Sequence, residues 1–140
     1  MRRLFGSLGL LPILLLLIVP SALAARPSSA FAGSWEAIDP GDGSHIELTI
    51  VGDTTTQAVM VDDVATGACA DASSETFVGL LVGKVSGSEM ITTFTAAKCG
   101  TQPITFVIGL QTFWWLEDGG NVNPTDDVLY NSFGEEYTRT

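Results

Sequence analysis

The sequence predicts an all-β fold: a single antiparallel up-and-down barrel of about seven or eight strands, with a β-sandwich as the alternative. Three observations lead to this prediction. From Phe31 onward, Thr, Val, Ile and aromatic residues come in short runs that Gly, Asp, Asn and Pro interrupt. No run shows a sustained helical period with caps. Nearly all connections suit local hairpins, and such a meander hides its edges best by closing into a barrel.

Turn residues and changes in apolar periodicity set the bounds of the expected strands. In chain order they are Ala32–Ile38, His45–Val51, Gln57–Val61, Thr76–Val85, Met90–Ala96, Ile104–Leu116, Val128–Ser132 and Glu135–Arg139. The first turn contains Pro40, which presets φ, and Gly41 and Gly43, which permit positive φ. The second strand, "HIELTI", alternates strictly between polar and apolar residues. This alternation indicates one buried and one solvated face.

The segment Ile104–Leu116 is expected to be one long strand, or two strands bent at Gly109. Its even positions are almost all apolar, so we expect that side to face the core: Ile104, Phe106, Ile108, Leu110, Trp114 and Leu116. Trp115 then shares the outer face with Phe113 and Val107. Exposed aromatic residues near a barrel mouth indicate a ligand or partner surface, unless the following loop or a dimer covers them.

The strand at Thr76–Val85 is apolar on both faces. One face carries Phe77, Leu81 and Val85, and the other carries Val78, Leu80 and Val82. An apolar outer wall favours a packed partner or a subunit interface, so a homodimer is one expectation.

The N-terminal region reads as a secretory signal peptide spanning residues 1–24. Two arginines precede an apolar run, and "SALAA" supplies small residues for cleavage after Ala24. A retained anchor is the alternative, although the run is short for a membrane span of about 20 residues. We expect residues 25–31 to be a short lead-in and residues 32–140 to form the single barrel domain. The protein is therefore expected to be secreted or otherwise extracytoplasmic.

The two cysteines, Cys69 and Cys99, are expected to form one disulfide, because an isolated pair in an exported chain is most simply explained that way. By the loop-entropy model this bond contributes roughly 3–4 kcal/mol. A reactive thiol or a metal site is the alternative. Two cysteines and one distant histidine fall short of a tetrahedral zinc set.

The acidic composition excludes some partners. After removal of residues 1–24 the chain keeps four basic and sixteen acidic side chains, hence a formal charge of −12. Such a surface repels nucleic acid and anionic lipid, so we expect neither nucleic acid nor a membrane as a partner of the mature chain.

Residues for catalysis or metal binding are sparse. The single histidine, His45, lies on the polar face of its strand, and no G-x-S-x-G elbow accompanies it. Paired acidic residues are interpreted as solvated turns and edge charges, and no D-x-D-x-D-G calcium loop is present. The loop "EDGGNVNPTDD" is the remaining candidate for a weak calcium site. We therefore expect no catalytic residue, no cofactor and no metal ligand.

Two short motifs resemble the calycin superfamily, which comprises lipocalins, avidin-like proteins and small bacterial relatives. "GSW" at Gly33–Trp35 starts the first strand, and "YTR" at Tyr137–Arg139 ends the last. The resemblance implies that Trp35 closes the bottom of the barrel and that Arg139 packs across its ring, a cation–π contact of roughly 0.5–2 kcal/mol. The chain is shorter than the larger lipocalins and lacks their helix before the last strand.

The favoured function is a secreted, non-catalytic, lipocalin-like binding protein for a small apolar molecule. It requires a cavity, and we expect Phe106, Ile108, Leu48 and Met60 to line it. The alternative is a protein-interaction module, such as a barrel-type protease inhibitor or a cell-surface domain, which would use Phe113 and Trp115. A hydrolase is the second alternative and requires a cleft with converging acids. The candidate contact residues are Phe113, Trp115, Phe106 and Met60.

Overall fold

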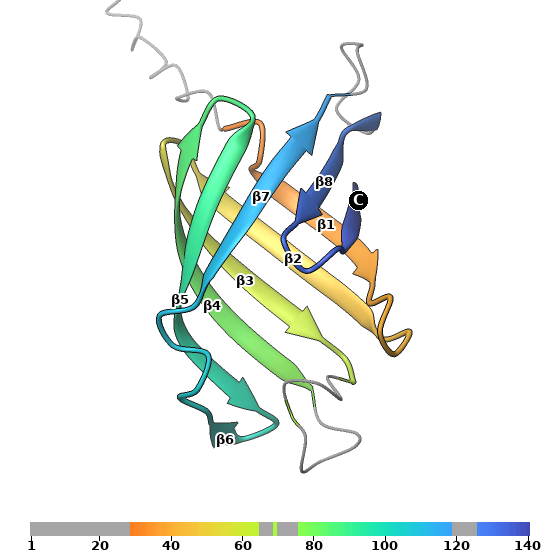
Figure 1. Ribbon diagram of the computed structural model, residues 1–140, viewed down its shortest axis with the longest axis vertical. Coiled ribbons are helices and arrows are strands. Elements are labelled where there is room, and N and C mark those ends of the chain that lie inside the picture. Colours follow the sequence, from red (N-terminus) through yellow and green to blue (C-terminus); the bar gives the residue numbers. More distant parts are fainter. Residues whose placement is uncertain (1–28, 65–68, 70–75, 119–125) are drawn as a thin grey trace, which may run out of the picture.

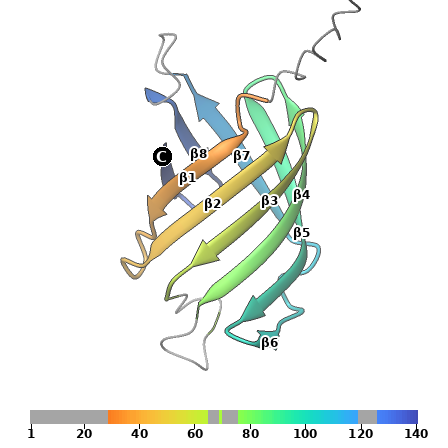
Figure 2. The ribbon, with the colours of Figure 1, turned by 180° about the vertical axis from the view of Figure 1, so that it is seen from behind.

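The protein forms a closed antiparallel up-and-down barrel of eight strands, which confirms the predicted fold class (Figures 1 and 2). The computed structural model describes residues 29–64, 69, 76–118 and 126–140. Within these residues the strands are β1 Gly33–Ile38, β2 His45–Gly52, β3 Thr55–Asp62, β4 Phe77–Ser86, β5 Glu89–Cys99, β6 Gln102–Pro103, β7 Gln111–Glu117, β8 Val128–Asn131 and β9 Glu136–Arg139.

Each barrel strand pairs with its neighbours in chain order, and the wall closes where β1 pairs with β9. The two-residue strand β6 pairs only with the end of β5 and lies outside the barrel. Figure 1 shows β6 and the end of β5 as a small hairpin below the barrel wall. Local pairing of this kind is what the short connections in the sequence predict.

Strict alternation along the strands fills the barrel interior. In β2, Ile46, Leu48 and Ile50 are buried, whereas Glu47 and Thr49 are exposed. The same period of two appears in β3 and β4. Because successive side chains of a strand point to opposite faces, one face of each strand builds the core and the other forms the outer wall.

One strand changes its parity through a β-bulge. In β5, Met90 and Phe94 point inward before the bulge, and Ala97 and Cys99 point inward after it. The register shifts opposite Leu80 and Leu81. An extra residue on one strand bends that strand and re-aims the side chains that follow. The bulge therefore turns Cys99 inward, where it meets Cys69.

The predicted disulfide is present, with the Cα atoms of Cys69 and Cys99 5.7 Å apart. It ties the segment after β3 to the end of β5. A disulfide is consistent with an extracytoplasmic location. The signal peptide expected at residues 1–24 lies outside the described residues. Within those residues, no helix has the length and hydropathy that a membrane span requires.

The strands differ greatly in length, and this makes the barrel wall uneven. β4 and β5 have 10 and 11 residues, whereas β8 and β9 have four each. β9 pairs with β1 only at Trp35 and Glu36, so Ile38 extends beyond its neighbour. The turn between β8 and β9 consequently lies about halfway up the barrel in Figure 1.

The predicted long strand over Ile104–Leu116 is wrong in its first half. Only Gln111–Glu117 is a strand, and the preceding residues form turns in which the amide of Ile108 donates to Thr105 O at 3.1 Å. Phe106 and Ile108 are exposed there, and Val107 is buried instead. The alternation predicted from the even positions fails because this segment leaves the sheet, so its side chains no longer point alternately inward and outward.

At one end of the barrel, here called the closed end, Trp35 fills the interior. Arg139 lies over its ring, with the guanidinium carbon 4.1 Å from the ring centroid, as the resemblance implies. Gly33 explains the glycine of "GSW": its φ is +142°, and a Cβ there would lie 2.5 Å from Nη1 of Arg139. A side chain at this position would displace the guanidinium that covers the tryptophan.

Phe31 also belongs to the closed end, although the sequence assigns it to the lead-in. It is fully buried, and its carbonyl accepts a hydrogen bond of 2.9 Å from Trp35 Nε1. Further into the barrel, next to this layer, Trp114 packs against Tyr137 with ring centroids 5.6 Å apart. These large side chains leave the closed half of the barrel packed.

Candidate functional site

The opposite end of the barrel contains a cavity of about 420 Å³, here called the cup. Its described lining residues are Asp39, Ile46, Met60, Asp62, Phe77, Phe94, Val107, Leu110, Phe133 and Glu135. Half of them are inward-facing residues of β2, β3, β4 and β5, and the other half come from turns and connecting segments. A cavity of several hundred Å³ with apolar walls and few polar groups is the usual form of a small-molecule site.

The walls of the cup are positioned by alternation on neighbouring strands. Ile46 pairs with Asp62 across β2 and β3, and Asp62 pairs with Phe77 across β3 and β4. Phe94 of β5 packs edge-on against Phe77, with ring centroids 6.1 Å apart. Four adjacent strands thus place one apolar or acidic side chain each around the same opening.

A glycine in β4 makes room for the two rings. A Cβ at Gly79 would lie 2.5 Å from Phe94 Cε1 and 3.0 Å from Phe77 Cε1. Any side chain at this inward position would push the rings from their places, so Gly79 sets the width of the cup on this side.

The segment between β6 and β7 forms part of the rim. Hydrogen bonds join it to β5: Gly109 N donates to Phe94 O at 2.9 Å, and Phe94 N donates to Leu110 O at 3.0 Å. These bonds hold Val107 and Leu110 against the opening. The exposed turn that disrupts the predicted strand therefore has a structural consequence, because it supplies apolar residues to the rim.

Three buried polar side chains form a hydrogen-bonded cluster beside the cup, at the β8–β9 hairpin. The carboxylate of Glu135 accepts hydrogen bonds from the Tyr137 hydroxyl and from Nδ2 of Asn131, the latter at 2.5 Å. All three side chains are buried. Burial is the main cause that raises the pKa of Glu135 above its usual value, and the two hydrogen bonds lower it in part. Burial also raises the pKa of Tyr137.

Two further carboxyl groups line the cup. Asp62 is buried at the end of β3, and burial raises its pKa while the hydrogen bond from the Val64 amide, at 3.3 Å, partly offsets the effect. Asp39, in the turn after β1, accepts a hydrogen bond of 2.6 Å from Gly41 N. The interpretation of the acidic pairs as solvated is therefore wrong for Asp62 and Glu135. In each pair one residue faces inward and its neighbour faces solvent.

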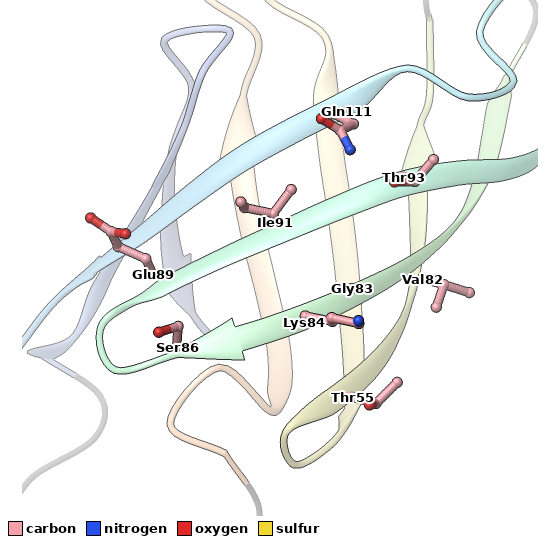
Figure 3. A pocket seen from close by; sticks show the side chains of 9 residues that line it. All are labelled: Thr55, Val82, Gly83, Lys84, Ser86, Glu89, Ile91, Thr93 and Gln111. Carbon is pink, nitrogen blue, oxygen red and sulfur yellow. The ribbon is translucent and has the colours of Figure 1, made fainter.

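A second hollow, of about 510 Å³, lies on the outer wall of the barrel. Figure 3 shows its lining side chains mainly on β4 and β5, with Thr55 from β3 and Gln111 from β7. Val82, Lys84, Glu89 and Ile91 are all exposed there. Although larger than the cup, this hollow lies over outward-facing residues, and no buried side chain points into it. The cup is the better candidate site.

The contact residues expected from the sequence divide between the two faces. Met60 lines the cup. Phe106, Phe113 and Trp115 are exposed, with Phe113 and Trp115 on the outer wall of β7. The sequence did not single out Phe77, Phe94, Asp62 or Glu135 as site residues. Their apolar and acidic alternation is visible in the sequence, but strand pairing is needed to bring them together.

The remaining candidates for chemistry lie elsewhere. His45 is partly exposed, and its Nε2 lies 3.6 Å from Glu36 on the outer surface. Within the described residues, no group of three or more His, Cys, Asp or Glu side chains is placed to hold a metal ion. Residues 119–125, most of the proposed calcium loop, lie outside those residues.

Comparison of the chain with models of protein families, with curated proteins and with solved structures found no match.

Proposed function

We propose that this protein is a secreted, non-catalytic binding protein that holds a small molecule in the cup. One observation carries the proposal: the barrel interior is packed at one end and hollow at the other. Trp35 and Trp114 fill the closed half. Ile46, Met60 and the Phe77–Phe94 pair leave a cavity beyond it. A hollow with apolar walls and a few polar groups at the mouth of a barrel is the usual form of a small-molecule site, and this supports a ligand there.

The barrel is also compatible with a calycin-type fold, and we propose that the protein belongs to the calycin superfamily. The support is the position of "GSW" on β1, the Arg139–Trp35 contact and the order of strands. Barrels of this size typically have an interior that side chains fill or that holds one small ligand. The volume of the cup, about 420 Å³, falls in the range of small-molecule sites.

A fluorescent apolar probe tests the proposed function. The mature, disulfide-bonded protein is titrated with N-phenyl-1-naphthylamine, a neutral molecule that becomes fluorescent in apolar surroundings. We expect saturable binding to one site. Native mass spectrometry of the protein purified from its own host then identifies a retained ligand by its mass.

Two neighbouring substitutions on β3 locate the binding. Met60→Trp fills the cup and is expected to weaken probe binding at least about tenfold. Val59→Trp places the same ring on the outer wall, where Val59 is exposed, and should leave the affinity unchanged. Thermal melts verify that both variants fold. Equal probe affinities in the two variants would refute the cup as the binding site.

The outer wall favours a second candidate function, a protein-interaction module. Six large apolar side chains are exposed on β3, β4, β5 and β7: Val59, Leu80, Val82, Ile91, Phe113 and Trp115. Cross-strand pairs connect several of them, including Val59 with Leu80 and Ile91 with Phe113. Sedimentation of the wild type and of the Phe113→Ala/Trp115→Ala variant tests this face for self-association. A monomer at every concentration would exclude the homodimer.

A further inference from the structure

The cup combines three carboxyl groups with an apolar wall. Asp39, Asp62 and Glu135 come from three separate parts of the chain, and none of the described lining residues is Lys, Arg or His. Asp39 and Asp62 both lie close enough to Glu135 to raise its pKa further by charge repulsion. The cup therefore concentrates negative charge around a space that is otherwise apolar.

The basic side chains of the described residues lie elsewhere. Lys84 lines the outer hollow, and Lys98 is exposed on the outer face of β5. Arg139 covers Trp35 at the closed end and forms a salt bridge of 3.3 Å with Asp127. His45 faces Glu36 on the outer surface. None of these side chains lines the cup.

Neutral groups supply the hydrogen bonds that the cup carboxylates accept. Their donors are the Gly41 amide for Asp39, the Val64 amide for Asp62, and Tyr137 and Asn131 for Glu135. Such bonds compensate only part of the cost of burying a negative charge. The raised pKa values of Asp62 and Glu135 reflect that uncompensated cost. A cationic ligand would offset it.

Aromatic rings complete the recognition chemistry. Phe77 and Phe94 form a T-shaped pair, with an interplanar angle of 71°, on the wall opposite the β8–β9 turn. The face of an aromatic ring attracts an ammonium group, and the attraction grows when the ammonium leaves water. Ile46 and Met60 offer an apolar surface for the body of the same ligand.

We propose that the ligand of the cup is an organic monocation, an amine or methylated ammonium carried on an apolar body. The ammonium lies toward Asp62, Glu135 and the two phenylalanine rings, and the apolar body packs on Ile46 and Met60. This assignment rests on the proposed binding function and specifies the class of ligand. A bare divalent metal ion fits less well, because it requires six or more oxygen ligands at close range.

Three molecules of the same shape test the assignment: 2-phenylethylammonium, neutral 2-phenylethanol and anionic phenylacetate. Each is titrated into the mature, disulfide-bonded protein at about pH 8, well above the ordinary pKa of a carboxyl group, and NMR follows the methyl group of Met60. We expect the cation to bind at least about tenfold more tightly than the alcohol, and the anion not to saturate. Equal binding of cation and alcohol would overturn the ligand class and leave the proposed function intact.

Two other outcomes would also overturn the assignment. One is a titration in which the cation shifts only exposed residues and leaves Met60 unchanged. The other is the absence of binding by all three molecules. The neutral fluorescent probe described above tests binding in the cup independently, so failure of the ligand class and failure of the binding function give different results.

Charge-neutralising variants locate the recognition. Glu135→Gln and Asp62→Asn are each expected to reduce the preference for the cation over the alcohol several-fold, with little change in affinity for the alcohol. Glu136→Gln is the matched control: it removes the same charge from the adjacent residue, which is exposed. A preference that is unchanged in both cup variants, or lowered equally by the control, would refute the roles of Asp62 and Glu135. Thermal melts verify folding, and the two cup variants check each other.

Discussion

At the closed end, Trp35 and Trp114 fill the barrel, whereas at the other end a cavity remains and a disulfide joins the surrounding wall. The closed end is stabilised by packing and by the stacked Arg139. The cup end lacks that packing, and Cys69–Cys99 links the segment after β3 to the last residue of β5 there. The comparison shows how a small barrel combines a stable half with a hollow one: a covalent bond replaces the missing core.

The largest expected difference between the two ends concerns removal of a core side chain. Trp35→Ala should lower the free energy of unfolding by about 3–5 kcal/mol, because it opens a cavity in packed surroundings and removes the platform of Arg139. Met60→Ala, beside the cup, should cost about 2 kcal/mol, at the low end of the range for a buried methionine, since fewer contacts are lost. Urea unfolding measures both values. Equal losses would show that the two ends are packed alike.

Loss of the disulfide should have the next largest effect. The double variant Cys69→Ala/Cys99→Ala is expected to lose about 3–4 kcal/mol, from the entropy of a loop whose ends are 30 residues apart in the sequence. Affinity for the fluorescent probe should fall as well, because the disulfide lies at the cup end.

Chemical reduction of the wild type provides the control, since it breaks the same bond without changing the composition. Hydrogen exchange should rise first in the cup-end half of β4 and β5. Faster exchange around Trp35 before any change at the cup would contradict the division between the two ends.

The smallest expected effect is a dependence on pH that belongs to the cup alone. Burial raises the pKa of Glu135 in the folded state. The folded protein therefore binds this proton more tightly than the unfolded chain, and the associated stability is complete below the unfolded pKa of about 4.3. That stability is lost as the pH rises through the folded pKa. Glu135→Gln should flatten this part of the stability–pH curve, measured by urea unfolding.

Asp39, Asp62 and Tyr137 are the charged or titratable groups that act on Glu135 in the structure. Asp62 has a raised pKa of its own, so Glu135→Gln removes only part of the dependence. Glu136→Gln, at an exposed position, should leave the curve almost unchanged. A curve that both variants flatten equally would assign the effect to overall charge instead.

The closed end was largely predictable from the sequence. The resemblance of "GSW" and "YTR" to the calycin superfamily implies the contact of Arg139 with Trp35, and the pairing of β1 with β9 brings the two residues together. The inward residues of β2 follow from strict alternation. The pairing of Cys69 with Cys99 follows from the presence of only two cysteines. Local pattern and closure of the sheet are sufficient for these features.

The cup was less predictable, for physical reasons. Alternation predicts which side of a strand faces inward only while the chain stays in the sheet, and residues 104–110 leave it. The bulge in β5 reverses the parity that leads to Cys99. Glu135 looks like a solvated turn residue in the sequence, and only the hairpin that brings Tyr137 and Asn131 beside it makes its burial tolerable.

The short strands β8 and β9 have a consequence for how a ligand could enter or leave the cup. At a rise of about 3.3 Å per residue, the four residues of β8 span about 13 Å, whereas the ten residues of β4 span about 33 Å. The barrel wall therefore has a low edge beside Phe133 and Glu135, and among the described residues no strand extends past this edge. A ligand of the proposed site would leave over this low edge without breaking any strand pairing. Its residence time would then be set by its contacts inside the cup.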